Sequence, residues 1–236
     1  VINTIYGPIN NTGTANDFLG GLTVDTNGNP VTVPAALLGA SGVGVTRADL
    51  SVTGGTGYIS APSVTFSKPA AANGVAAAGY AIVIGGSVTD VVITNPGVYA
   101  STETPTIQLL GGFASGAGTA ATVTSSQLTT GNTSGGLTKT GLGTLTITGT
   151  GNTYTGVTTI SEGTLQLGNL NGLGSSVGTL TVNGGVLDLN NIAAVTVGNL
   201  TGTGGTIANN GAGANTFTIG NGGGSGGNFQ GVITNN

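Results

Sequence analysis

Residues 135–169 constrain the fold more than any other part of the chain, because short β-like runs alternate there with turns that contain Gly and Asn. Leu145 and Ile147 stand two residues apart, as do Leu165 and Leu167, with a polar residue between them. This is the period of a strand with one buried face. Each run is too small to enclose a core, so it can bury its apolar face only by stacking on a similar unit. The pattern predicts a β-solenoid.

The same residues resemble a known family. Leu-Thr-Lys-Thr-Gly at 137–141 and Asn-Thr-Tyr-Thr-Gly at 152–156 resemble the autotransporter-associated β-strand repeat of bacterial surface and secreted proteins. Residues 178–236 resemble the sequence that follows this repeat. The resemblance implies a right-handed parallel β-helix, export from a bacterial cell, and a structural or adhesive role. It supplies no catalytic residues.

The sequence predicts an all-β protein organised in three segments. Residues 1–50 are an N-terminal extended segment with a hairpin at 22–33, whose central Asn-Gly suits the positive φ angles of a type I′ turn. Residues 51–134 are a β-rich module with a diverged tandem repeat. Residues 135–236 form the parallel β-helix. The module that precedes it is a small β-sandwich-like or irregular β module.

The middle segment contains a diverged tandem repeat, in which residues 57–66 recur loosely at 97–101 and 105–109, and the Ala-rich run at 74–83 recurs near 116–123. Gly-Tyr at 57–58 recurs as Gly-Val-Tyr at 97–99, an offset of roughly forty residues, in the range of repeat architectures. Short strands and frequent turn signals predict a small sandwich or barrel there. The sequence leaves open whether residues 1–134 form one domain or two.

Composition excludes several classes of protein. The chain has no Cys and no His, so most zinc, copper and nucleophile–base arrangements are ruled out. Its three basic residues are too few to neutralise a nucleic-acid backbone. Hydrophobic residues make up 37% of the chain and charged residues 4%, the reverse of a disordered composition. We expect no cofactor, no nucleic-acid partner and no membrane-spanning segment.

The acidic residues do not form a catalytic cluster in the sequence. Glycan-cleaving enzymes need carboxylates close together, whereas the predicted β-helix holds only Glu162 and Asp188, far apart. Residues 25–29 place oxygen ligands at alternate positions, as calcium loops do, but lack the distal Glu of an EF-hand. We therefore interpret them as a turn and predict no catalytic and no metal-ligating residues. The seven acidic residues are Asp17, Asp25, Asp49, Asp90, Glu103, Glu162 and Asp188.

The C-terminal sequence indicates how copies associate. A β-helix leaves an unpaired row of backbone groups at each end, which is usually capped, but residues 228–236 contain no Lys, no Pro and no acidic residue. Either the chain is a passenger fragment cut from a longer protein, or the open end is a docking face. We predict the second, with head-to-tail strand addition and Val1–Ile9 as the partner strand. The predicted interface residues are Val1, Ile2, Ile5, Ile9, Phe229, Val232 and Ile233.

Two functions follow from these patterns. The first is a non-enzymatic structural subunit of a bacterial extracellular filament or cell-surface assembly, in which copies of this chain form a homopolymer. Low charge favours it, because little electrostatic repulsion keeps copies apart. The alternative is an autotransporter passenger-type adhesin fragment that binds surface glycans, a host surface or an abiotic surface. Both functions imply an extracellular or cell-surface location.

Overall fold

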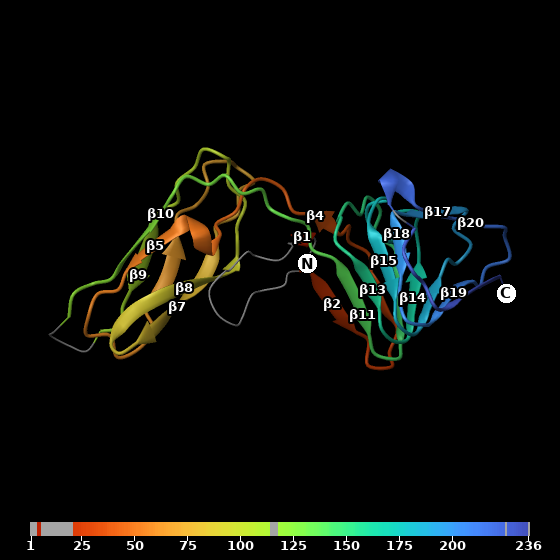
Figure 1. The fold of residues 1–236 in the computed structure, drawn as a ribbon, viewed down its shortest axis with the longest axis horizontal. Helices are drawn as coiled ribbons and strands as arrows, with labels where there is room; N and C mark the ends of the chain where they lie inside the picture. The colour runs from red at the N-terminus through yellow and green to blue at the C-terminus, as the bar shows by residue number, and fades with distance from the viewer. Residues whose placement is uncertain (1–3, 6–20, 114–117, 225, 236) are drawn as a thin grey trace. The chain divides into compact units, whose positions relative to one another are not determined.

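The computed structural model describes residues 4–5, 21–113, 118–224 and 226–235. The regular elements of these residues are strands, apart from two short 3₁₀ turns, η1 (Arg47–Asp49) and η2 (Asn221–Gly223). They divide into two compact units (Figure 1). Each unit has its own hydrophobic core. Unit 1 contains the described residues of 1–7, 20–40 and 134–236, and unit 2 those of 41–133.

Unit 1 is a parallel β-solenoid, which confirms the predicted all-β class with a C-terminal β-helix. Its strands are β1 (Thr4–Ile5), β2 (Leu22–Asp25), β3 (Val31–Val33), β4 (Leu38–Gly39), β11 (Leu137–Thr140), β12 (Thr144–Ile147), β13 (Thr158–Ile160), β14 (Thr164–Leu167), β15 (Thr179–Val182), β16 (Val186–Asp188), β17 (Ala194–Val197), β18 (Asn199–Thr201), β19 (Thr206–Asn209), β20 (Thr216–Ile219) and β21 (Val232–Asn235). One sheet has the order β18-β15-β13-β11-β2, and the second has the order β21-β19-β16-β14-β12-β3. Two further parallel pairs, β1–β4 and β17–β20, lie outside these sheets.

The hairpin predicted for residues 22–33 is wrong. β2 pairs in parallel with β11, and β3 pairs in parallel with β12, so the turn at Asn27 and Gly28 joins the two sheets of one coil. The physical reason is burial, because an isolated two-stranded hairpin has no neighbour to cover its apolar face, whereas the next coil covers Val24 and Val31. The solenoid thus has a coil at 21–40, and unit 2 is inserted between this coil and the four or so coils of residues 137–235.

Apolar columns run through unit 1, because equivalent residues of successive coils lie in register. One column passes from Leu145 through Leu165, Leu187 and Ile207 to Ile233. Its members are 20, 22, 20 and 26 residues apart along the chain, and the first four are fully buried. Burying each such side chain stabilises the fold by about 1.5–3 kcal/mol. The coils therefore share one continuous core.

Glycine is required where the chain turns from the first sheet into the second. Gly163 has a φ of 63°, and a Cβ there would lie 2.3 Å from the carbonyl oxygen of Gly141 in the coil before it. Gly185 has a φ of 66°, and its Cβ would lie 2.3 Å from the carbonyl oxygen of Gly163. Both the positive φ and the close stacking exclude a side chain. These corners explain the glycines that recur between the β-like runs of the sequence.

Unit 2 is a ring of six short strands. They are β5 (Leu50–Thr53), β6 (Ser63–Phe66), β7 (Ala78–Ile84), β8 (Ser87–Asn95), β9 (Ile107–Leu110) and β10 (Thr122–Ser125). β5–β10, β6–β9 and β7–β8 are antiparallel hydrogen-bonded pairs. β5 also contacts β8, β6 contacts β7, and β9 contacts β10. These contacts close the six strands into a small barrel-like module, one of the forms that the sequence predicts for this segment.

The two repeats of unit 2 are intertwined. The hydroxyl of Tyr58, in the first repeat, accepts a hydrogen bond from the backbone N–H of Ala121 in the second, at 2.9 Å. The hydroxyl of Tyr99, in the second repeat, accepts the equivalent bond from Ala77 in the first, at 2.8 Å. Burial raises the pKa of Tyr99, which keeps its hydroxyl neutral. Each repeat therefore supplies the tyrosine hydroxyl that accepts a backbone hydrogen bond from the other repeat.

Candidate assembly edge

The last described strand of the solenoid presents a partly open edge. Among the described strands, β21 pairs with β19 alone, with Ile233 opposite Ile207. Ile207 is fully buried, whereas Ile233 is 56% exposed and Val232 is 59% exposed. The N–H of Val232 donates to Gly205 O at 3.0 Å. Because backbone N–H groups alternate sides along a strand, the N–H of Ile233 faces away from β19.

The predicted interface residue Phe229 lies differently from Val232 and Ile233. It is partly buried, packs against the core of unit 1, and forms a parallel bridge with Gly202. The ring of Phe229 therefore covers the core of the last coil. Of the three predicted C-terminal residues, Val232 and Ile233 are the ones that stand exposed on β21.

Of the predicted N-terminal interface residues, the structure describes Ile5. Ile5 lies in β1, which pairs in parallel with β4, so that Ile5 is opposite Gly39. Val1, Ile2 and Ile9 lie outside the described residues. The described part of the segment Val1–Ile9 is thus paired with β4.

An asparagine pair continues across the last two coils. Ile147 and Leu167 are in register in the early coils, whereas Asn209 and Asn235 are in register in the last two. Asn209 is 3% exposed, and its Nδ2 donates to Gly213 O at 2.7 Å and to Asn235 Oδ1 at 3.1 Å. Its Oδ1 accepts from the N–H of Asn191 at 3.0 Å. Such amide ladders favour in-register stacking of strands, and Asn235 carries the ladder to the edge.

Asp188 is a buried carboxylate held by hydrogen bonds. Its Oδ2 accepts from Gln166 Nε2 at 3.0 Å, and its Oδ1 accepts from the N–H groups of Asn190 at 2.9 Å and Asn210 at 3.2 Å. Burial alone would raise the pKa of Asp188, but these hydrogen bonds outweigh burial and lower it. The group links neighbouring coils as a structural anion, and the described neighbours bring no second carboxylate to it.

Lys139 is a residue that sequence reasoning missed. It is fully buried in β11, in register with Val24 and Ile160 of the adjacent coils. Burial lowers the pKa of Lys139, an effect that the carboxylates of Asp25 and Glu162 partly offset. The signal was present in Leu-Thr-Lys-Thr-Gly, because period-2 alternation places the Lys on the same inward face as Leu137.

A hollow of about 440 Å³ lies next to this lysine on the solenoid surface. Asp25 and Glu162 line it together with Asn27, Thr140, Leu142 and Ser161. Asp25 Oδ1 accepts a hydrogen bond from the N–H of Asn27 at 2.8 Å. The carboxylate of Asp25 therefore stabilises the turn that the sequence predicts at residues 25–29. In the part of the chain that the structure describes, no group of three potential metal-ligating side chains occurs.

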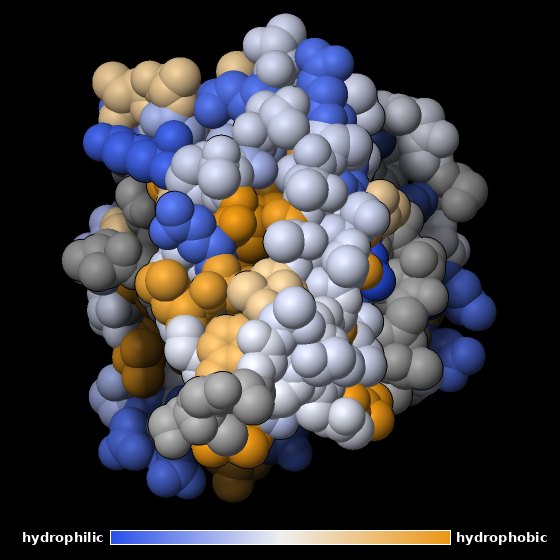
Figure 2. All heavy atoms as spheres, turned by 90° about the vertical axis from the view of Figure 1, so that its left-hand side faces the viewer, coloured by the Kyte–Doolittle hydropathy of each residue, from blue (hydrophilic) through white to orange (hydrophobic). Residues whose placement is uncertain are grey.

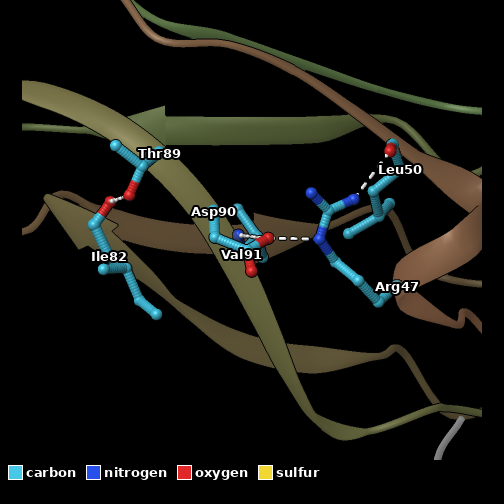
Figure 3. Close-up of polar contacts among 6 residues, drawn as sticks. All are labelled: Arg47, Leu50, Ile82, Thr89, Asp90 and Val91. Atoms are coloured by element: carbon cyan, nitrogen blue, oxygen red, sulfur yellow. Dashed lines mark hydrogen bonds and ion pairs between the residues drawn. The ribbon is translucent and has the colours of Figure 1, made fainter. Parts of the chain in front are cut away.

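In unit 2 two of the few charges neutralise each other. Arg47 Nε forms an ion pair with Asp90 Oδ1, and Arg47 Nη1 donates to Leu50 O at 3.0 Å (Figure 3). Asp90 Oδ1 also accepts from the N–H of Val91 at 2.7 Å. The pair fixes η1 against β8. These charges therefore hold the module together.

The comparisons agree with the geometry of unit 1. The family model of the passenger-associated-transport repeat matches residues 137–167. This match fits an autotransporter-associated β-strand repeat in residues 137–167. The comparisons with curated proteins and with solved structures give no match. Repeat and solenoid together indicate an autotransporter passenger-like β-helix, a type of secreted or cell-surface protein that is typically structural. Among the described residues, no helix is long and apolar enough to cross a membrane.

Proposed function

We propose that the chain is a non-enzymatic structural subunit of an extracellular or cell-surface assembly, and that copies join at the outer edge of β21. The observation that carries this proposal is the half-exposed column end, where Ile233 continues a row of fully buried side chains. A strand added there would cover Ile233 and Val232. It would also pair with the outward N–H of Ile233, as in strand addition to a sheet edge.

Two properties of the edge support addition of a strand in register. The Asn209–Asn235 ladder ends in an amide that a further Asn or Gln can meet. β21 contains no charged residue and no Pro, the two features with which proteins usually block an edge. We propose the segment Val1–Ile9 of another copy as the added strand. Because β1 pairs with β4 in the structure, this addition requires residues 4–5 to leave that pairing.

The experiment is sedimentation of the full chain over a range of concentrations, with negative-stain microscopy. We expect end-to-end oligomers that grow with concentration. Ile233→Pro removes the outward N–H and leaves the bond from Val232 to Gly205 intact, so it should reduce association strongly. Ile233→Val keeps the N–H and is the matched control. Oligomers that are unaffected by Ile233→Pro, or a wild-type chain that stays monomeric throughout, contradict the proposal. Deleting residues 1–9 tests the proposed partner strand separately.

A second candidate, adhesion to an uncharged apolar surface, is favoured by one end of unit 2. Three loops meet there, because the N–H of Tyr58 donates to Gly86 O at 3.0 Å and the N–H of Ile59 donates to Gly112 O at 2.9 Å. Ile59 is 74% exposed and Ile84 is 66% exposed. Figure 2 shows apolar side chains gathered on the face that unit 2 turns to the viewer. Exposed apolar groups of this kind often mark interaction sites.

This candidate is tested by adsorption to a methyl-terminated monolayer. If unit 2 is adhesive, Ile59→Asp and Ile84→Asp should each weaken adsorption severalfold. Leu142→Asp is the matched control, because Leu142 is 80% exposed on unit 1. Equal losses from all three substitutions would show that general hydrophobicity, and not this end of unit 2, causes adsorption.

A further inference from the structure

The ammonium of Lys139 sits in a cage of oxygen atoms drawn from three successive coils. Its Nζ donates to Thr26 Oγ1 at 3.0 Å, from the coil before. It donates to the carbonyl oxygens of Thr140 at 2.8 Å and Gly141 at 2.5 Å, from its own coil. It donates to Glu162 O at 3.1 Å, from the coil after. One ammonium therefore links the corners of all three coils.

The position of the side chain is unusual for a lysine. Lys139 is fully buried, and it stands in a column whose neighbours are Val24 and Ile160. A buried charge is costly unless its partners satisfy it. Here the stem of the side chain follows the apolar column, while the head reaches the corner where backbone carbonyls converge. The titratable groups that face it are Asp25 and Glu162, both of opposite charge.

The cage has the size and chemistry of a site for a large monovalent cation. Its oxygens lie 2.5–3.1 Å from Nζ, whereas Mg²⁺ and Ca²⁺ require about 2.0–2.6 Å. Three of the four oxygens are backbone carbonyls, which replace the hydration shell of K⁺ in protein sites. An ammonium group and K⁺ are similar in size and charge. The corner thus resembles a potassium site whose ion is covalently attached to the chain.

We propose that Lys139 is a tethered cation, and that its cage binds a free monovalent cation when the ammonium is removed. In the intact protein the tether keeps the corner occupied whatever ions surround it. Other parallel β-helix repeats bind dissolved Ca²⁺, whereas this corner carries its own cation. The cage lies in the interior of unit 1, and binding of a cation there does not depend on the proposed assembly at β21.

The test compares the melting of the full chain in different chloride salts at one ionic strength, by circular dichroism. Lys139→Ala opens the cage and leaves space for an ion. Its melting temperature in tetramethylammonium chloride should fall by about 10 °C, since one partner of a buried network is lost. Potassium or methylammonium should restore part of this loss, with a saturable concentration dependence, because both ions fit the cage and tetramethylammonium does not.

Lys68→Ala is the matched control, because Lys68 is an exposed lysine. Its melting temperature, like that of the wild type, should be the same in the three salts. The proposal is overturned if Lys139→Ala is as stable as the wild type, or if its melting temperature does not depend on which cation is present.

A second measurement needs no substitution and so does not depend on the variant folding. Lysine ammonium protons ordinarily exchange with water too fast to be observed by NMR. The caged ammonium of Lys139 should give a ¹⁵N–¹H correlation with slowed exchange, while Lys68 should give none. Absence of a protected lysine ammonium signal in the folded wild type would overturn the proposal. Its presence would support the cage whether or not copies of the chain associate.

Discussion

Ile207 and Ile233 occupy the same column of unit 1 and differ in burial, so together they measure what one further coil contributes. Ile207 is fully buried and Ile233 is 56% exposed. Ile207→Ala should lower the free energy of unfolding by about 3 kcal/mol, from lost burial and the cavity left behind. Ile233→Ala loses a little under half of a full burial, so we expect about 1 kcal/mol. Urea denaturation at low protein concentration, followed by circular dichroism, measures both values.

The same pair distinguishes an isolated coil end from one covered by another copy. Binding to the folded state adds stability by mass action, about 2.7 kcal/mol at a hundredfold excess over the dissociation constant. If copies stack at β21, the cost of Ile233→Ala should rise with protein concentration, while that of Ile207→Ala should change much less. Equal costs for the two substitutions at low concentration would refute the burial argument. A cost for Ile233→Ala that is independent of concentration would refute stacking.

Three further predictions concern the interiors of the two units. Folding lowers the pKa of Asp188, so the ionised carboxylate stabilises the folded state above the ordinary pKa of 3.8, and this stabilisation is lost as pH falls through the folded pKa. Asp188→Asn should reduce the free energy of unfolding at pH 7 by about 2 kcal/mol. In urea titrations the variant should also show a weaker dependence of stability on acid pH. Gly163→Ala should lower the free energy of unfolding by at least about 2 kcal/mol, because the added Cβ is strained and overlaps the neighbouring coil. The control is Gly151→Ala, since Gly151 has a φ of 76° but open space around it. Equal losses of stability in the two variants would refute the stacking argument. Tyr99→Phe should cost about 1–3 kcal/mol in thermal melts, because the buried N–H of Ala77 loses its acceptor, and a neutral result would contradict that role.

The regular part of the fold could be predicted from the sequence because period and glycine spacing act locally. Leu145, Ile147, Leu165 and Leu167 all point inward, as their alternation indicates. The coil at 21–40 could not be predicted in this way, since its partners β11 and β12 lie more than a hundred residues away. An Asn-Gly turn between two apolar runs has the same local pattern in a hairpin and in a solenoid corner, so only the distant partner decides.

The three predicted C-terminal interface residues also differ in how far the sequence predicts their surroundings. The apolar character of Val232 and Ile233 predicts an interface role, and both residues lie exposed on β21. Phe229 has the same apolar character but packs on the core of unit 1. The role of Lys139 could not be predicted from charge alone. A lysine in an alternating run is usually solvated, and the convergence of carbonyls that accepts it exists only once three coils have stacked.

The insertion of unit 2 has a consequence for the order of folding. Val31 and Leu145 are neighbours in the second sheet, but the chain between them must be made before they can meet. Contacts over such a distance form late, because closing a long loop costs entropy that local contacts avoid. The coils after residue 137 can form from nearby neighbours alone. Residues 21–40 are therefore synthesised before their partner strands β11 and β12. Until those strands are made, the apolar side chains of residues 21–40 stay exposed to solvent.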